Sequence, residues 1–200
     1  MLDATLRKVI DPPLNVAGVR LARLGLSANA LTLTGFGIGL AAIPALATEN
    51  YAAALALILA NRLMDGLDGA VARAAGGTDF GGFLDIVCDF IFYSGVVFGC
   101  ALARPENALA AAFLIFSFTG TGASFLAFAA IAARKGITTE VRGAKAIYYL
   151  GGLTEGTETI LVLCLFCVWP DGFAPVAWVF GALCWLTTAS RFHSAWRSFG

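Results

Sequence analysis

The chain has 200 residues, of which 59% are hydrophobic and only 13% are charged, and its mean hydropathy is +0.82. This composition excludes an ordinary soluble domain, in which about a quarter of the residues are charged. The 13 basic and 13 acidic side chains leave a formal net charge of zero, which argues against a nucleic-acid partner because nucleic-acid binding requires a basic face. The composition therefore indicates an integral membrane protein.

Residues 1–24 form a mixed segment ahead of the apolar part of the chain. Four basic residues alternate there with apolar ones: Arg7, Lys8, Arg20 and Arg23. This pattern is typical of an amphipathic helix in the headgroup region, with its basic residues toward anionic membrane lipid. We predict one or two interfacial helices, broken near Pro12 and Pro13. A solvated basic arm is the alternative.

Six apolar stretches follow, each long enough to cross a hydrocarbon core of about 30 Å. We place them at 28–47, 51–73, 81–103, 108–133, 146–169 and 173–191. The predicted fold class is thus all-α: a polytopic membrane protein with six transmembrane helices and an N-terminal interfacial amphipathic helix. A single domain then covers residues 1–200, with a juxtamembrane segment at 1–24 and a six-helix bundle at about 28–191.

The basic residues set the orientation of this bundle. If the N-terminus is cytoplasmic, nearly all of them lie on or near the cytoplasmic side, and only Arg104 faces out. Arg62 lies within the second stretch. The positive-inside rule then places both termini in the cytoplasm.

The second and third stretches carry four acidic residues near the turn between them. These are Asp65, Asp68, Asp85 and Asp89. Spacings of three and four residues make each pair project from one face of its helix, and the topology sets both pairs at similar depth in adjacent antiparallel helices. Gly69 and Gly81 each lie four residues from an acid on the same stripe. They leave open backbone there, with room for a bulky anion.

Four carboxylates in or near a bilayer need compensation, because each costs about 2.5–3.5 kcal/mol at the bilayer centre. Hard divalent cations such as Mg²⁺ or Mn²⁺ take oxygen ligands, whereas Zn²⁺ usually takes His or Cys, and the only histidine is His193. Because Mg²⁺ keeps several waters, four acids are more than one ion normally uses. We therefore predict two Mg²⁺ or Mn²⁺ ions per active site, clamping a diphosphate.

The acids also belong to a longer pattern. The integral membrane enzymes of the CDP-alcohol phosphotransferase family have a signature that the chain closely resembles in two blocks, Asp65-x2-Asp68-Gly69-x2-Ala72-Arg73 and Gly81-x3-Asp85-x3-Asp89. The gap between the blocks is slightly shorter than is common in the family. The resemblance implies transfer of a phosphatidyl group from a CDP-linked lipid, most often CDP-diacylglycerol, to the hydroxyl of a small alcohol, with release of CMP. It also implies a bacterial inner-membrane enzyme with a cytoplasmic active site, and a homodimer.

The resemblance assigns roles to individual residues. Asp65, Asp68 and Asp85 are expected to bind metal, and Asp89 is expected both to lie at the metals and to act as the catalytic general base. Five residues are expected to contact the CDP group: Asn29, Asp68, Gly69, Arg73 and Gly81. Asn29 is included because Ala28-Asn29-Ala30-Leu31-Thr32 is similar to the family's Pro-Asn-x-x-Thr segment, with Ala28 in place of proline.

The acceptor alcohol is left open by the sequence. Seven residues are candidates for binding it: Arg134, Lys135, Arg142, Lys145, Glu155, Glu158 and Arg191. The basic ones either attract a phosphate-bearing acceptor, such as glycerol phosphate or inositol phosphate, or only mark the cytoplasmic side. The two glutamates, placed inside the fifth stretch, either receive an amine or polyol acceptor or hold that helix to its neighbours by hydrogen bonds.

Two other classes of protein share part of this pattern. Intramembrane aromatic prenyltransferases also use Asp-rich motifs and Mg²⁺ on a lipid diphosphate, but they have more spans and do not need the Gly69-x2-Ala72-Arg73 element. A cation transporter would spread its polar residues through the full depth of the membrane and would show an internal repeat. The acids of this chain are concentrated at one end instead.

Overall fold

The structure is a computed structural model that describes residues 3–136 and 152–200. The helices of these residues are, in chain order, α1 (Asp3–Arg23), α2 (Ala28–Leu40), α3 (Ala42–Ala47), α4 (Tyr51–Ala75), α5 (Asp79–Ala103), α6 (Ala108–Arg134), α7 (Gly156–Val168) and α8 (Phe173–Phe199). Two 3₁₀ turns, η1 (Pro105–Asn107) and η2 (Pro170–Gly172), precede α6 and α8. The predicted all-α class is confirmed.

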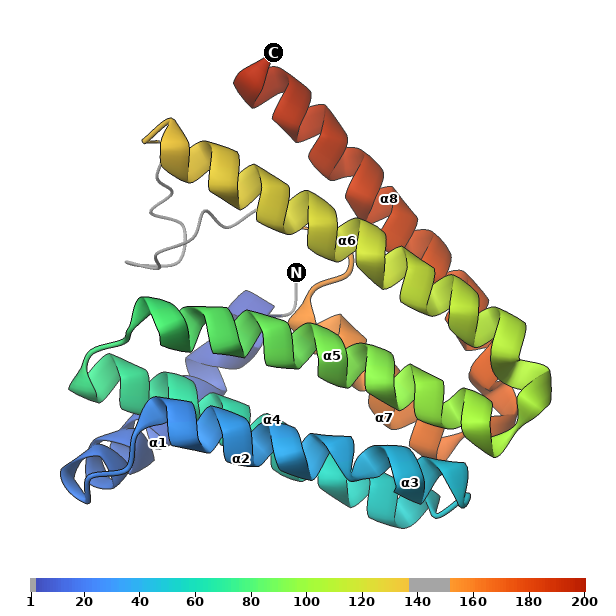
Figure 1. The fold of residues 1–200 in the computed structure, drawn as a ribbon, viewed down its shortest axis with the longest axis horizontal. Helices are drawn as coiled ribbons and strands as arrows, with labels where there is room; N and C mark the ends of the chain where they lie inside the picture. Colours follow the sequence, from blue (N-terminus) through green and yellow to red (C-terminus); the bar gives the residue numbers. More distant parts are fainter. Residues whose placement is uncertain (1–2, 137–151) are drawn as a thin grey trace.

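The helices form two groups (Figure 1). α2 and α3 run along α4 and α5, and α1 packs against α4. α6 and α8 lie along each other as a second group, which contacts the first through α5. α7 packs on α4 and α5 and connects through η2 to α8. Because α2 contacts both α4 and α5, it lies between the two helices that carry the acidic motif.

An apolar core fills the part of the bundle away from the α4–α5 turn. Its largest fully buried side chains include Ile58 of α4, Phe92 of α5 and Phe166 of α7. The acidic residues of α4 and α5 lie nearer the turn, beyond this core. Apolar packing therefore holds the middle of the bundle together, and the end near the α4–α5 turn is available for polar side chains.

Within residues 3–136 and 152–200, four helical stretches are long and apolar enough to cross a bilayer: Ala28–Ala47, Asp79–Ala103, Pro105–Arg134 and Pro170–Phe199. α4 has 25 residues, enough for a crossing, but Arg62, Asp65 and Asp68 interrupt its apolar sequence. The described helix α7 has only 13 residues. A polytopic membrane protein is thus confirmed, whereas the number of six spans stays a prediction.

The predicted break near Pro12 and Pro13 is wrong, because both prolines lie inside the continuous helix α1. Close packing against α4 supports this helix on the C-terminal side of the prolines. A Cβ on Gly66 would come within 2.8 Å of the Leu14 side chain, and one on Gly18 within 2.6 Å of the Ala70 Cβ. Contacts with a neighbouring helix offset the hydrogen bonds that proline cannot make.

The first predicted stretch, 28–47, is divided into α2 and α3 at Ala41. Pro44 explains the division, since its ring and missing N–H disturb the helical hydrogen bond to Leu40. The fifth predicted stretch, 146–169, is corrected in its described part, since residues 146–151 lie outside the described residues. Residues 152–155 are not helical and α7 begins at Gly156, so the helix starts later than its apolar sequence suggested.

The connections at the end opposite the α4–α5 turn are joined by Arg104. Its Nη1 lies 2.5 Å from Asp171 Oδ1, and its Nη2 lies 3.3 Å from Glu49 Oε2. These hydrogen bonds raise the pKa of the Arg104 guanidinium above its usual value. The connections that carry Glu49, Arg104 and Asp171 therefore lie together, at the end where Arg104 is predicted to face out.

Candidate metal and nucleotide site

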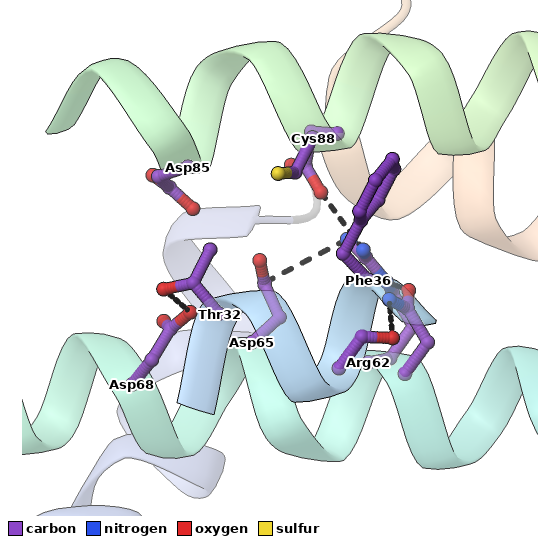
Figure 2. Close-up of a pocket in the computed structure, with 10 residues that line it drawn as sticks. Thr32, Phe36, Arg62, Asp65, Asp68, Asp85 and Cys88 are labelled. Atoms are coloured by element: carbon purple, nitrogen blue, oxygen red, sulfur yellow. Dashed lines mark hydrogen bonds and ion pairs between the residues drawn. The ribbon is translucent and has the colours of Figure 1, made fainter. Parts of the chain in front are cut away.

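Three of the four predicted acids converge between α4 and α5. Asp65 and Asp68 of α4 and Asp85 of α5 each offer one carboxylate oxygen, and these oxygens all lie within 4.8 Å of one another. Figure 2 shows Asp85 reaching from α5 toward the two acids of α4. Asp68 is buried, Asp65 is half-buried and Asp85 is exposed. A set of oxygen ligands with an open side suits a hard divalent cation, which keeps part of its water shell.

α2 holds the most buried of these acids in place. The Thr32 hydroxyl donates a hydrogen bond of 2.6 Å to Asp68 Oδ2, and Figure 2 shows this contact between α2 and α4. Thr32 was not predicted as a site residue, although it closes the Asn29-x-x-Thr32 segment that suggested a nucleotide contact. The sequence therefore contained a signal for it.

Asp89 lies outside the group of three and is paired differently. Its Oδ1 accepts a hydrogen bond from Arg62 Nη2 at 2.8 Å, and its Oδ2 accepts one from the Tyr93 hydroxyl at 2.9 Å. Arg62 also lies 3.6 Å from Asp65 Oδ2, so Asp65 and Asp89 lie on the same side of the bundle. The role of Asp89 as a fourth metal ligand stays a prediction.

Arg62 and Tyr93 are site residues that the sequence analysis missed. Arg62 precedes Asp65 by three positions and Tyr93 follows Asp89 by four, spacings at which helical side chains contact each other. Both could have been noticed from this spacing alone. The pocket around the acids is lined by Thr32, Gly35, Phe36, Asn61, Arg62, Asp65, Asp68, Asp85, Cys88 and Asp89.

Four of the five residues predicted to contact CDP lie in two pairs, and the fifth, Asp68, belongs to the acidic group. Asn29 lies against Gly81, since a Cβ on this glycine would come within 2.8 Å of Asn29 Oδ1. Gly69 lies beside Arg73, whose Nη1 would be 3.3 Å from a Cβ on Gly69. Arg73 also donates a hydrogen bond of 3.0 Å from Nε to Asn15 Oδ1 of α1. The amphipathic helix α1 thus reaches one of the signature residues.

The described acceptor candidates lie on α6, α8 and around the start of α7, and none of them lines the pocket around the acids. Arg134 and Lys135 are exposed at the end of α6. Arg191 is buried on α8, and its Nη1 donates a 2.7 Å hydrogen bond to the Thr121 carbonyl of α6. Arg142 and Lys145 lie outside the described residues.

Glu155 and Glu158 form a capping box at the N-terminus of α7. The backbone N–H of Glu155 donates to Glu158 Oε2 at 3.1 Å, and the Glu155 Oε1 accepts from the N–H of Gly152 at 3.2 Å. Such a box satisfies N–H groups that the first helical turn leaves unpaired. Both glutamates therefore make hydrogen bonds that order the start of α7.

The sequence profile of CDP-alcohol phosphatidyltransferases matches residues 26–190. The chain belongs to the CDP-alcohol phosphatidyltransferase family. Among its relatives in this family, Inner membrane protein YnjF of Escherichia coli (strain K12) is 55% identical over 197 residues, which cover 98% of the chain and 96% of that protein. Phosphatidylinositol phosphate synthase of Mycobacterium marinum is 27% identical over 205 aligned positions, covering 90% of the chain and 78% of that enzyme.

Solved structures of the family share this fold. Phosphatidylinositol phosphate synthase (PgsA1) of Mycobacterium tuberculosis in complex with manganese and citrate superposes with a TM-score of 0.71 at 25% identity, covering 92% of the chain and 88% of that protein. The same enzyme with CDP-DAG bound has a TM-score of 0.71 at 22% identity, with 92% and 93% covered. The similarity to this CDP-DAG-bound structure supports the fold of the chain.

Membership of the CDP-alcohol phosphatidyltransferases makes this protein a transferase of substituted phosphate groups in phospholipid biosynthesis. It favours this class over the prenyltransferase and the cation transporter, which share the acids but not the complete signature. The group formed by Asp65, Asp68 and Asp85 fits a divalent cation by its oxygen ligands, in keeping with the manganese bound by the mycobacterial relative.

Proposed function

We propose that this protein transfers a phosphatidyl group from CDP-diacylglycerol to the hydroxyl group of a small alcohol and releases CMP. The observation that carries the proposal is the convergence of Asp65, Asp68 and Asp85 from two helices in a member of a family that performs this type of reaction. The position of these acids beyond the apolar core also suits a donor whose acyl chains stay in the membrane while its nucleotide lies at the interface.

In this proposal Asp65, Asp68 and Asp85 hold divalent metal, Mg²⁺ or Mn²⁺, and Asp89 supplies a further ligand when two ions are bound. Bound divalent metal would neutralise the charge that develops on the diphosphate as CMP leaves. The Thr32 hydroxyl supports this arrangement because it fixes the orientation of the Asp68 carboxylate,.

The transfer itself needs one proton acceptor. The hydroxyl oxygen of the alcohol forms a bond to the phosphorus that bears diacylglycerol, and the bond from this phosphorus to the phosphate oxygen of CMP breaks. The proton of the attacking hydroxyl passes to the Asp89 carboxylate. The proximity of Asp89 to Asp65, which share Arg62 as a neighbour, supports this assignment.

The nucleotide is proposed to lie along the glycine positions of the signature. Gly69 allows the CDP group to approach the α4 backbone, and Arg73 beside it offers a guanidinium for the phosphates. Asn29 and Gly81, which lie against each other, border the other part of the nucleotide.

For the acceptor, we propose a phosphate-bearing polyol, with inositol phosphate as the first compound to test. The names of several relatives, phosphatidylinositol phosphate synthases and archaetidylinositol phosphate synthases, support this choice. Arg134, Lys135 and Arg191 are the described basic residues proposed to contact its phosphate, together with Arg142 and Lys145. The capping box favours a structural role for Glu155 and Glu158.

We further propose that the chain is one domain in the inner membrane, with both termini and the active site cytoplasmic, and that it works as a homodimer. The concentration of basic residues on the side of the α4–α5 turn supports this orientation. The E. coli relative named as an inner membrane protein supports the location.

The test is an assay of the purified protein in lipid nanodiscs with CDP-diacylglycerol, Mn²⁺ or Mg²⁺, and one acceptor at a time: inositol phosphate, glycerol phosphate or serine. We expect release of CMP and a new phospholipid, identified by mass spectrometry, that both disappear with a metal chelator. Asp171→Asn, which alters an acid at the opposite end of the bundle, is the control for protein quality. Absence of CMP release with every acceptor and both metals would contradict the proposed function.

A further inference from the structure

Asp89 differs from the other three acids because both of its carboxylate oxygens are held by neighbouring side chains. Arg62 Nη2 donates to Oδ1 at 2.8 Å and the Tyr93 hydroxyl donates to Oδ2 at 2.9 Å. Arg62 Nη1 lies 3.3 Å from the Tyr93 hydroxyl oxygen, so the three side chains form a closed triangle. A carboxylate bound at both oxygens is restricted to one orientation, and its remaining lone pairs point in fixed directions.

Arg62 is itself fixed by contacts that reach α2. Its Nε donates to Asn61 Oδ1 at 2.8 Å, and Asn61 Nδ2 donates to the Gly35 carbonyl at 2.8 Å. The guanidinium carbon lies 4.8 Å from the centre of the Phe92 ring, a distance typical of cation–π contacts. Only 4% of Asn61 is exposed. α2, α4 and α5 therefore all contribute to holding Arg62 in place.

Arg62, Asn61 and Tyr93 lie outside the two signature blocks. The guanidinium presents several N–H donors in a planar fork, which lets one side chain contact Asp89 at 2.8 Å and Asp65 at 3.6 Å. A lysine carries the same charge but only a compact ammonium, which does not reproduce this geometry.

We propose that Arg62 is a positioning residue of this enzyme: together with Tyr93 it holds the Asp89 carboxylate in the orientation from which it accepts the proton of the acceptor hydroxyl. This inference rests on the proposed function, in which Asp89 is the base. Arg62 acts through Asp89 and does not contact the CDP-lipid. Its replacement should therefore lower the rate of transfer by more than it weakens the binding of donor or metal.

The alternative is that Arg62 only compensates the charge of two acids at membrane depth. Arg62→Lys distinguishes the positioning role from charge compensation, because lysine keeps the positive charge but lacks the planar set of guanidinium N–H donors. Tyr93→Phe removes one donor to Asp89 and leaves every charge in place. If only charge matters, both variants should behave like the wild type.

The experiment measures kcat and KM for CMP release, and Mn²⁺ affinity by electron paramagnetic resonance, in nanodiscs. For Arg62→Lys we expect kcat to fall by about tenfold to a hundredfold, less than the loss of about 10²–10⁴-fold expected when a general base is removed. KM for the donor should change by less than about twofold, and Mn²⁺ affinity should fall by much less than kcat. Tyr93→Phe should also lower kcat by more than it changes KM or Mn²⁺ affinity, with a smaller loss of kcat than Arg62→Lys. Arg104→Lys, a matched change at the opposite end of the bundle, should leave all three values unchanged.

The second arm combines Arg62→Lys with Asp89→Asn. If Arg62 acts only through Asp89, the double variant should be no slower than Asp89→Asn alone, because residues of one catalytic unit are not additive. Three results would overturn the inference. They are a double variant in which the two losses of kcat multiply, a wild-type kcat for Arg62→Lys, and a loss of Mn²⁺ affinity in Arg62→Lys as large as its loss of kcat. Should Arg62→Lys fail to fold, Tyr93→Phe decides in the same way. Full turnover by Asp89→Asn would contradict the proposed base itself, a separate result.

Discussion

Thr32 connects α2 to the acidic group through one hydrogen bond, of 2.6 Å from its hydroxyl to Asp68 Oδ2. Asp68 is only 6% exposed, so few waters can replace this donor. Donors behind a metal ligand set the orientation of the ligand and commonly change metal affinity when they are removed. The Thr32 hydroxyl should therefore contribute to metal binding although it is not a ligand.

We predict that Thr32→Val, which replaces the hydroxyl by a methyl group of similar size, weakens Mn²⁺ binding by about tenfold. Thr34→Val is the matched control, because Thr34 is exposed on the same helix and donates to its own Ala30 carbonyl. Mn²⁺ titrations of the two variants in nanodiscs give the comparison. Equal affinities would show that the contact to Asp68 is not used in metal binding.

At the scale of residues, the acids and the partners at helical spacing could be predicted from the sequence, whereas the contacts between helices could not. The spacing of Asp65 and Asp68 within one helix follows from local geometry, and so does the distance between Asp89 and Tyr93. The contact of Thr32 with Asp68 joins positions 36 apart in the sequence, and that of Arg62 with Asp89 joins positions 27 apart. Such contacts depend on the rotation of packed helices, which apolar patterning does not fix closely enough.

The start of α5 shows how one element places a signature glycine. Thr78 caps this helix, and its hydroxyl oxygen accepts from the N–H of Gly81 at 3.0 Å. A Cβ on Gly81 would come within 2.8 Å of Asn29 Oδ1 and within 3.1 Å of Thr78 Oγ1. A side chain at position 81 would therefore force the Asn29 side chain to shift.

We predict that Gly81→Ala displaces the Asn29 side chain and raises KM for the CDP-linked donor by about tenfold, the effect of losing one good polar contact. Gly82→Ala is the control, since a Cβ at Gly82 meets nothing within 4 Å. Both are measured as CMP release at varied donor concentration. A normal KM for Gly81→Ala would count against a nucleotide contact at Asn29.

The capping box at α7 yields a prediction about Glu158. Glu158→Gln keeps an acceptor for the N–H of Glu155 and should preserve both thermal stability and activity. Glu158→Ala removes the acceptor and should destabilise the protein by about 1 kcal/mol, which a thermal unfolding midpoint will detect. A large loss of activity in Glu158→Gln at unchanged stability would favour the acceptor-binding interpretation instead.

At the scale of elements, the helices were predicted and several of their ends were not. α4, α5 and α6 begin and end within about two residues of the expected positions, as usual for long apolar segments. The errors occur where tertiary contacts or capping compete with local preference. α1 continues through Pro12 and Pro13 because it packs against α4, and α7 begins only at Gly156, after the capping residue Glu155. Neither effect is visible in hydropathy.

The molecule as a whole divides its polar groups between two ends. The acids and Arg62 lie near the α4–α5 turn, while Arg104 joins Glu49 and Asp171 at the opposite end. The apolar core lies between these two regions. α4 carries both part of this core and three charged site residues. For this reason its sequence is not apolar enough to indicate a membrane span, although its length is sufficient.

The most direct test of the account is Mn²⁺ binding by Asp85→Asn in nanodiscs, compared with the wild type. Asp85 is the one member of the group of three that comes from α5, so its carboxylate tests whether the two helices share a metal. We predict that the wild type binds Mn²⁺ and that Asp85→Asn binds it at least about tenfold more weakly, while Asp171→Asn binds it normally. Wild-type affinity in Asp85→Asn would contradict a metal site built between α4 and α5.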